Sequence, residues 1–123
     1  MDARLEIRTA GIADLEPIAA LFAERHRRDR TGVAFLEPRL EDRAAARELV
    51  EPLFSNGRAR VAVAEAGGQV AGFLTGEEML FAPADMASQY VPPHSISMPI
   101  EGHAVADEYD PVRVYRALYG FLA

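Results

Sequence analysis

Residues 58–81 read RARVAVAEAGGQVAGFLTGEEMLF, and no other stretch of the chain constrains the fold as strongly. Val61 and Val63 alternate with small residues, which is the two-residue period of a half-buried β-strand. The adjacent glycines Gly67 and Gly68 favour a tight hairpin turn, because such turns need positive φ angles. Hydrophobic residues resume after the turn. The stretch therefore predicts an antiparallel β-hairpin in the middle of the chain.

The segment before the hairpin predicts one strand and two helices. Residues 4–9 (RLEIRT) alternate between polar and hydrophobic side chains, as a short strand does. In residues 10–29 the hydrophobic side chains recur every three or four positions, which indicates an amphipathic helix. Residues 30–38 contain glycine and proline and are expected to form a loop. A second helix is expected over residues 40–57, and Pro52 within it favours an earlier end.

The segment after the hairpin predicts a loop, a strand and a helix. Residues 82–93 are rich in proline and small residues, which is typical of a loop. Residues 94–106 (HSISMPIEGHAVA) predict a strand in which Pro99 and Gly102 mark an edge or a bulge. The last helix is expected to begin at Pro111 or one residue earlier. The order strand, helix, helix, strand, strand, strand, helix predicts an α+β fold with an antiparallel meander in its middle.

The composition is that of a single globular domain. The chain has 123 residues, of which 50% are hydrophobic and 26% charged, and this fits one domain over residues 1–123. The formal net charge of −6 argues against nucleic-acid binding, which needs a basic surface. The absence of cysteine excludes disulfides and thiolate metal sites. No apolar run approaches the ~20 residues of a membrane span, so we expect no membrane partner and a cytoplasmic location.

Two groups of polar residues have simple structural interpretations. The basic run RHRRDR, at residues 25–30, lies at the end of a predicted helix, where cations complement the helix dipole. We therefore expect a solvated helix end there and no nucleic-acid site. His94, Glu101 and His103 match no known metal-ligand spacing, so no metal is expected.

Three stretches resemble the front two-thirds of the Gcn5-related N-acetyltransferase (GNAT) family. Residues 5–22 (LEIRTAGIADLEPIAALF) resemble its opening strand and first helix. Residues 60–76 resemble its central hairpin, in which a pair like Gly72–Phe73 recurs, and residues 103–123 resemble its fourth strand and third helix. The resemblance implies a three-layer arrangement around a mixed, mostly antiparallel sheet. It also implies transfer of an acetyl group from acetyl-CoA, as cosubstrate, to an amine.

The turn before the last helix departs from the family's signature. In the family this turn reads Arg/Gln-x-x-Gly-x-Gly/Ala, and its backbone N–H groups hold the pyrophosphate of acetyl-CoA. Here Asp110, Arg113 and Tyr115 stand at the three signature positions, and none matches. We interpret the stretch as a phosphate-binding turn whose sequence has decayed, with Arg113 as a substitute partner for a phosphate. The resemblance places the cofactor-binding positions at Val105, Asp110, Arg113 and Val114.

The resemblance also implies where the base and the acceptor amine would lie. A glutamate on the family's fourth strand is a frequent base, so Glu101 is the first candidate and His103 the second. Their spacing of two places both on one side of a continuous strand. The structural alternatives are a solvated strand residue and a satisfied histidine at a strand end. Phe35 and Arg39, in the loop after the first helix, and Tyr90, before the fourth strand, are the substrate-binding candidates.

The family continues beyond the point where this chain ends. Its fifth strand, its fourth helix and a late tyrosine often used as the general acid would all follow Ala123. We therefore expect a domain truncated after the third helix, with an exposed edge beside the fourth strand. The expected partner is an identical subunit or a second GNAT-like domain. Two functions stay open: an N-acetyltransferase completed by further residues, and a non-catalytic module that packs against such a domain.

Overall fold

The structure is a computed structural model that describes residues 4–80 and 94–123. The elements in chain order are β1 (Glu6–Thr9), the 3-10 turn η1 (Ile12–Asp14), α1 (Leu15–Gly32), the 3-10 turn η2 (Pro38–Glu41), α2 (Arg43–Val50), α3 (Pro52–Ser55), β2 (Ala59–Ala66), β3 (Gln69–Leu80), β4 (His94–Ser97), β5 (His103–Val105) and α4 (Pro111–Leu122).

The central hairpin is confirmed as the middle of one antiparallel sheet. The strand order is β1-β2-β3-β4, and β5 pairs with the same strand, β3, as β4 does. Gly67 and Gly68 form the two-residue turn, with φ angles of 58° and 80°, between the paired residues Ala66 and Gln69. An L-residue at either position would be strained, which is why this turn uses two glycines.

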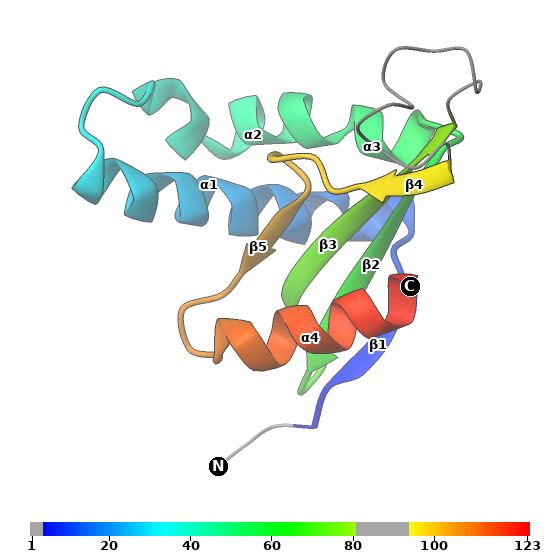
Figure 1. Cartoon of the computed structure of the whole chain (residues 1–123). Helices are drawn as coiled ribbons and strands as arrows, with labels where there is room; N and C mark the ends of the chain where they lie inside the picture. The colour runs from blue at the N-terminus through cyan, green and yellow to red at the C-terminus, as the bar shows by residue number, and fades with distance from the viewer. Residues whose placement is uncertain (1–3, 81–93) are drawn as a thin grey trace.

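Helices cover both faces of the sheet, so the molecule has the expected three layers (Figure 1). Alternate residues of the hairpin serve the two faces. Val61, Val63 and Phe73 pack under α1 and α2 in one hydrophobic cluster. Their neighbours in the hairpin pack against α4 in a second cluster, which includes Leu74 and Leu118.

Helices α1 and α2 begin at Leu15 and Arg43, a few residues later than the sequence predicts, and two further differences concern where the helical stretches end. The predicted second helix is divided, because Pro52 ends α2 at Val50 and starts the short α3. Helix α1 continues to Gly32, three residues into the predicted loop. The last helix begins as expected, with Asp110 as N-cap and Pro111 at the first position.

One residue of β3 lies so close to α4 that only glycine fits. A Cβ atom built on Gly72 would lie 2.8 Å from Cγ1 of Val114 and 3.1 Å from the carbonyl oxygen of Ala104. Val114 is itself completely buried in the first turn of α4. The Gly72–Phe73 pair therefore sets how closely α4 approaches the sheet.

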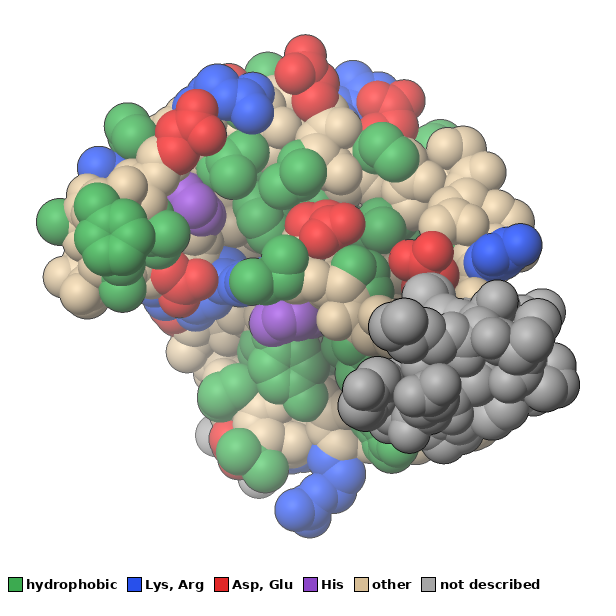
Figure 2. Space-filling model, turned by 45° about the horizontal axis from the view of Figure 1, so that its top comes forward, with side chains coloured by type: hydrophobic (Ala, Val, Ile, Leu, Met, Phe, Trp, Pro, Cys, Tyr) green, Lys and Arg blue, Asp and Glu red, His purple; other side chains and the backbone are tan. Residues whose placement is uncertain are grey.

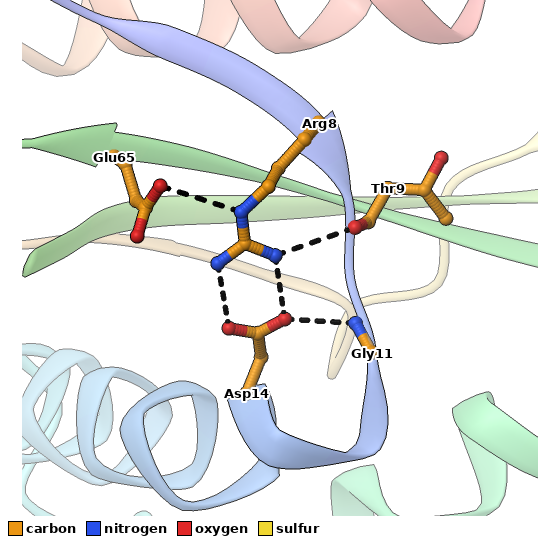
Figure 3. Close-up of polar contacts among 5 residues, drawn as sticks. All are labelled: Arg8, Thr9, Gly11, Asp14 and Glu65. Carbon is orange, nitrogen blue, oxygen red and sulfur yellow. Dashed lines mark hydrogen bonds and ion pairs between the residues drawn. The ribbon is translucent and has the colours of Figure 1, made fainter. Parts of the chain in front are cut away.

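A charged cluster joins the end of β1 to the start of the first helix (Figure 3). Arg8 donates two hydrogen bonds to the buried carboxylate of Asp14, at 2.8 and 2.9 Å, and a weaker one to Glu65. Asp14 also accepts the backbone N–H of Gly11 at 2.8 Å. The hydrogen bond from Arg8 lowers the pKa of Asp14, against a smaller opposing effect of burial. The cluster fixes the direction in which the chain leaves β1.

In the part of the chain that the structure describes, no helix is both long and hydrophobic enough to cross a membrane.

Candidate functional site

The two catalytic candidates, Glu101 and His103, lie at the edge of the sheet, where a turn interrupts the predicted fourth strand. Glu77 of β3 pairs with Ser97, and Leu74 pairs with His103, so two residues of β3 face five residues on the other side. Residues 98–102 form a turn, which is closed by a hydrogen bond of 2.9 Å from the Gly102 N–H to the Pro99 carbonyl. The bulge predicted at this place is confirmed, but it is large enough to split the strand.

This turn separates the two catalytic candidates. Glu101 lies in the turn and lines a cavity of about 280 Å³ against α1 and α2. His103 lies in β5 and lines a cavity of about 290 Å³ against α4. The expectation that both side chains lie on one side of a continuous strand is therefore wrong. The physical reason is the odd number of inserted residues, which breaks the alternation of the pleat.

On the α4 side, His103 is held by a tyrosine. Its Nδ1 atom lies 2.8 Å from the hydroxyl of Tyr115, and the two rings meet edge to face at 76°. Leu74, Met98 and Tyr119 complete the open, largely hydrophobic cavity. Burial lowers the pKa of His103, and Arg25 lowers it further, against a smaller effect of Asp29. His103 is therefore neutral at pH values where a free histidine begins to charge.

The helical spacing of Tyr115, Leu118 and Tyr119 is typical of core residues, and the structure buries only part of this set. Leu118 is completely buried, but Tyr119 is 56% exposed and Tyr115 is half-buried. Burial raises the pKa of Tyr115, so its hydroxyl stays protonated near neutral pH. Tyr115 lies one turn into α4 and lines two cavities, that of His103 and a second one at the N-terminus of the helix.

The second of these cavities lies at the N-terminus of α4, where the sequence resemblance places the cofactor. It has a volume of about 380 Å³ and is lined by Arg25, Arg28, Asp29, Val105, Ala106, Asp107, Tyr109, Pro111 and Tyr115. Asp110 caps the helix itself, accepting the Val112 N–H at 3.1 Å. A carboxylate of the chain thus holds one of the N–H groups that would attract an external anion.

The other cofactor-binding candidates have different positions around this cavity. Val105 lines it, but Val114 is buried against Gly72 and its side chain serves the core. Arg113 is exposed and is not among the residues that line the cavity. The positive charge of the cavity comes from α1, through Arg25 and Arg28.

These two arginines line the cavity, and the sequence argument did not single them out as site candidates. Arg25 donates to the carbonyls of Ile100 and His103 at 2.6 and 2.8 Å. Arg28 donates to the carbonyl of Val105 at 3.0 Å and is paired with the carboxylate of Asp107. The prediction of a merely solvated helix end at residues 25–30 is wrong for both. Their spacing of three, one helical turn, was the available signal.

The carbonyls that the arginines bind belong to the outer edge of β5. The Thr75 N–H donates to Gly102, and the Ala106 N–H donates to Ala71, so these residues pair with β3 through their hydrogen bonds. In an antiparallel ladder the residues between such pairs direct their carbonyls away from the partner strand. His103 and Val105 are in that position. The arginines therefore cover part of the edge that was expected to be exposed.

The cavity next to Glu101 is the third part of the site. Phe22, Leu36, Leu40, Leu49 and Ile100 make it hydrophobic, and Arg25, His26, Asp29 and Glu101 supply its polar groups. Among residues 4–80 and 94–123, no hydrogen bond or ion pair engages the Glu101 carboxylate. The side chain is partly exposed at the mouth of the cavity.

The substrate-binding candidates lie outside this cavity. Phe35 is 89% exposed, and Arg39 is paired with Glu37 on the surface. Their neighbours Leu36 and Leu40 line the cavity instead, so the loop contributes through the alternate side chains. Tyr90 falls outside the residues that the structure describes.

Figure 2 shows the face of the molecule on which these features meet. Hydrophobic side chains surround a histidine near the centre of this face, and acidic side chains border them. The described part of the chain holds no group of three or more histidine, aspartate or glutamate side chains placed to bind a metal ion.

Comparisons with known proteins define the class of fold. No family model matches the sequence, and no curated protein matches it. Among solved structures, a possible acetyltransferase from Clostridium difficile 630 gives a TM-score of 0.63 at 15% identity, over 98% of this chain and 69% of that chain.

Two further neighbours were solved with a form of coenzyme A. A predicted acetyltransferase with acetyl-CoA from Clostridium acetobutylicum gives a TM-score of 0.65 at 12% identity, over 97% of this chain and 71% of that chain. An aminoglycoside N-acetyltransferase in complex with CoA gives 0.61 at 13% identity, over 98% and 70%. The chain thus has the fold of the GNAT acetyltransferases and spans about 70% of the length of these neighbours.

Proposed function

We propose that this chain supplies the thioester-binding part of an acyl-CoA-dependent N-acetyltransferase, and that further residues or a second copy complete the site. One observation carries the proposal. The cavity at the N-terminus of α4 and the cavity of His103 share Tyr115 as a wall. A ligand with an anionic end and a short acyl end fits such a pair, with the anion beside Arg28 and the acyl group beside His103.

The cavity at the N-terminus of α4 can bind an anionic ligand if the ligand replaces Asp107 as the partner of Arg28. Arg28 is paired with Asp107, whose carboxylate is 56% exposed. A phosphate can replace this carboxylate, because an arginine binds both with the same planar fork of donors. The pairing with Arg28 lowers the pKa of Asp107, so the carboxylate stays ionised and competes for the arginine at neutral pH.

Acetyl-CoA, when bound, supplies the acetyl group as a thioester. The acceptor nitrogen loses a proton as the amide forms, and His103 takes this proton at Nε2. His103 is suited to the role because it is neutral, half-buried and at the edge of a hydrophobic cavity. It then returns the proton to the departing thiolate, so that the products are an amide and a free thiol.

Glu101 has a different role in this proposal. Its carboxylate has no hydrogen-bond or ion-pair partner among the described residues, and it lines the hydrophobic cavity between α1 and α2. An acceptor with a second, charged amino group and an apolar body would place that ammonium on Glu101 and its body against Leu36 and Leu40, apart from the nitrogen that is acetylated. Replacing Glu101 with glutamine is then expected to raise KM for the amine more than it lowers kcat.

Calorimetric titration of acetyl-CoA into the chain tests the proposal. We expect saturable binding that is weakened at least tenfold by Arg28→Ala and strengthened by Asp107→Asn, which releases Arg28. Arg116→Ala, an exposed arginine on α4 outside both cavities, is the matched control and is expected to bind as the wild type does. Absence of binding to the wild type, or equal effects of the three variants, would refute the cofactor site.

Turnover is measured as thiol release. The chain contains no cysteine, so a thiol reagent reports free coenzyme A without a protein background. With a panel of amines, His103→Gln is expected to lower kcat by about 100-fold, which is the lower range for a general base. Full activity of His103→Gln would remove the residue from this role.

A second function, a non-catalytic module that packs against an identical subunit, is supported by one observation. Ile96, Met98 and Ile100 on the free edge of the sheet are 53%, 39% and 76% exposed. Such a row of hydrophobic side chains is typical of a surface that binds another protein. Sedimentation equilibrium is expected to show a dimer that Ile100→Lys dissociates and Phe35→Lys, also at an exposed hydrophobic position, does not. A monomeric wild type would exclude the dimer.

A further inference from the structure

The hydrogen bond between His103 and Tyr115 constrains which nitrogen of the imidazole can act. It joins the start of β5 to the second turn of α4, and the donor and acceptor atoms lie 2.8 Å apart. The remaining surroundings of the ring in its cavity are Leu74, Met98 and Tyr119. In the described part of the chain Nδ1 is therefore the ring nitrogen with a partner, and Nε2 is left for a ligand.

The direction of this hydrogen bond decides whether Nε2 can accept a proton. A neutral imidazole carries one proton, so the hydrogen bond made by one nitrogen sets the state of the other. If Nδ1–H donates to the tyrosine oxygen, Nε2 holds a lone pair and is a base. If the tyrosine donates to Nδ1, Nε2 already carries the ring proton, has no free lone pair and cannot act as a base.

The environment of the tyrosine permits it to accept. A phenol oxygen can accept one hydrogen bond and still direct its own proton elsewhere. Tyr115 also lines the cavity at the N-terminus of α4, and the carboxylates of Asp29 and Asp107 line the same cavity. Arg25 and Asp29 of α1 are the charged groups that act on His103, and Tyr115 is the titratable group that contacts it from α4.

We propose that Tyr115 is a positioning residue, which accepts a hydrogen bond from Nδ1–H of His103 and so directs the Nε2 lone pair into the cavity formed with Leu74 and Met98. The inference rests on the proposed function, because it assigns the base of that reaction its orientation and tautomer. Sequence comparison with the family would not suggest it, since Tyr115 stands where the family signature has glycine or alanine. A side chain at a position of that signature would then take part in the site.

The tautomer is measured directly by nitrogen NMR of the imidazole rings. The chain has three histidines, and His103→Gln identifies the signals of this one. In the wild type we expect the Nδ1-protonated form to predominate at pH values above the pKa of His103. Tyr115→Phe removes only the hydroxyl and is expected to convert at least half of His103 to the other tautomer. Tyr119→Phe, which alters the same cavity without touching Nδ1, is expected to leave the nitrogen shifts unchanged.

Kinetics supply the second test. Tyr115→Phe is expected to lower kcat by about tenfold with little change in KM for acetyl-CoA, and to shift the acid limb of the kcat profile. In the His103→Gln background the same substitution is expected to have no further effect on kcat, because the positioned group is gone. Equal losses in both backgrounds would overturn the positioning role.

The two proposals fail in different experiments. A wild-type His103 protonated at Nε2, or a Tyr115→Phe variant with unchanged nitrogen shifts, overturns the inference whatever the turnover. Absence of acetyl transfer with the expected tautomer present overturns the proposed function and supports the His103–Tyr115 arrangement.

Discussion

Substituting Gly72 with alanine tests whether the close contact of β3 with α4 sets the packing of the second cluster. The new methyl group would lie 2.8 Å from Cγ1 of Val114, well inside van der Waals contact. The carbonyl oxygen of Ala104 and Cγ2 of Val105, each at 3.1 Å, prevent the methyl from moving aside. Helix α4 must therefore shift, and overpacking of this kind costs about 1–3 kcal/mol of unfolding free energy.

Urea denaturation followed by circular dichroism measures this cost. The control is Gly120→Ala on the outer face of α4, where a Cβ atom would meet nothing within 4 Å. This variant is expected to be more stable by about 0.5–1 kcal/mol, because alanine is the better helix former. In the Val114→Ala background the cost of Gly72→Ala is expected to fall by at least half, since the methyl that it meets is removed. The reasoning would be refuted if Gly72→Ala were as stable as the wild type. It would also be refuted if Gly72→Ala lowered the unfolding free energy equally with and without Val114→Ala.

Three further predictions concern the charged groups that hold the fold together. Asp14→Asn is expected to lower the unfolding free energy by about 1–3 kcal/mol, as loss of charged hydrogen bonds does; a variant as stable as the wild type in urea would contradict the role of the cluster in Figure 3. Because the folded pKa of Asp14 is depressed, this carboxylate stabilises the fold above pH 3.8, and that stabilisation is lost as the pH falls through the folded pKa. In acid titrations the unfolding free energy of Asp14→Asn is therefore expected to fall less than that of the wild type. Arg25→Ala is expected to speed hydrogen exchange in β5 and to increase self-association in size-exclusion chromatography, whereas its exposed neighbour Arg27→Ala is expected to change neither.

The parts of the fold that depend on local chemistry could be predicted from the sequence. Two adjacent glycines between alternating valines specified the hairpin and its turn, and the proline at position 52 specified a break in the second helical stretch. Asp110 and Pro111 specified the start of α4. In each case a residue with one strong backbone preference stands where that preference is needed.

The parts of the site that depend on distant contacts could not be predicted in this way. Pro99 and Gly102 signalled an irregularity, but the size of the insertion follows from where β3 pairs on either side of it, and pairing register is not local. Arg25 and Arg28 read as a solvated helix end because their partners are backbone carbonyls, which any sequence supplies. The spacing of Tyr115 along the helix indicated a core residue, because this spacing is the same whether the ring is buried in protein or lines a cavity.

The turn at residues 98–102 allows the segment that carries Glu101 to vary in length while the register of β5 on β3 stays the same. The register of β5 is fixed by its own pairing with β3, so residues can be added to or removed from the turn without rotating His103 out of its cavity. A continuous strand would not allow this, because an insertion of an odd number of residues would exchange the inward and outward positions beyond it. The side that carries Glu101 can therefore change its shape while His103 keeps its place beside Tyr115.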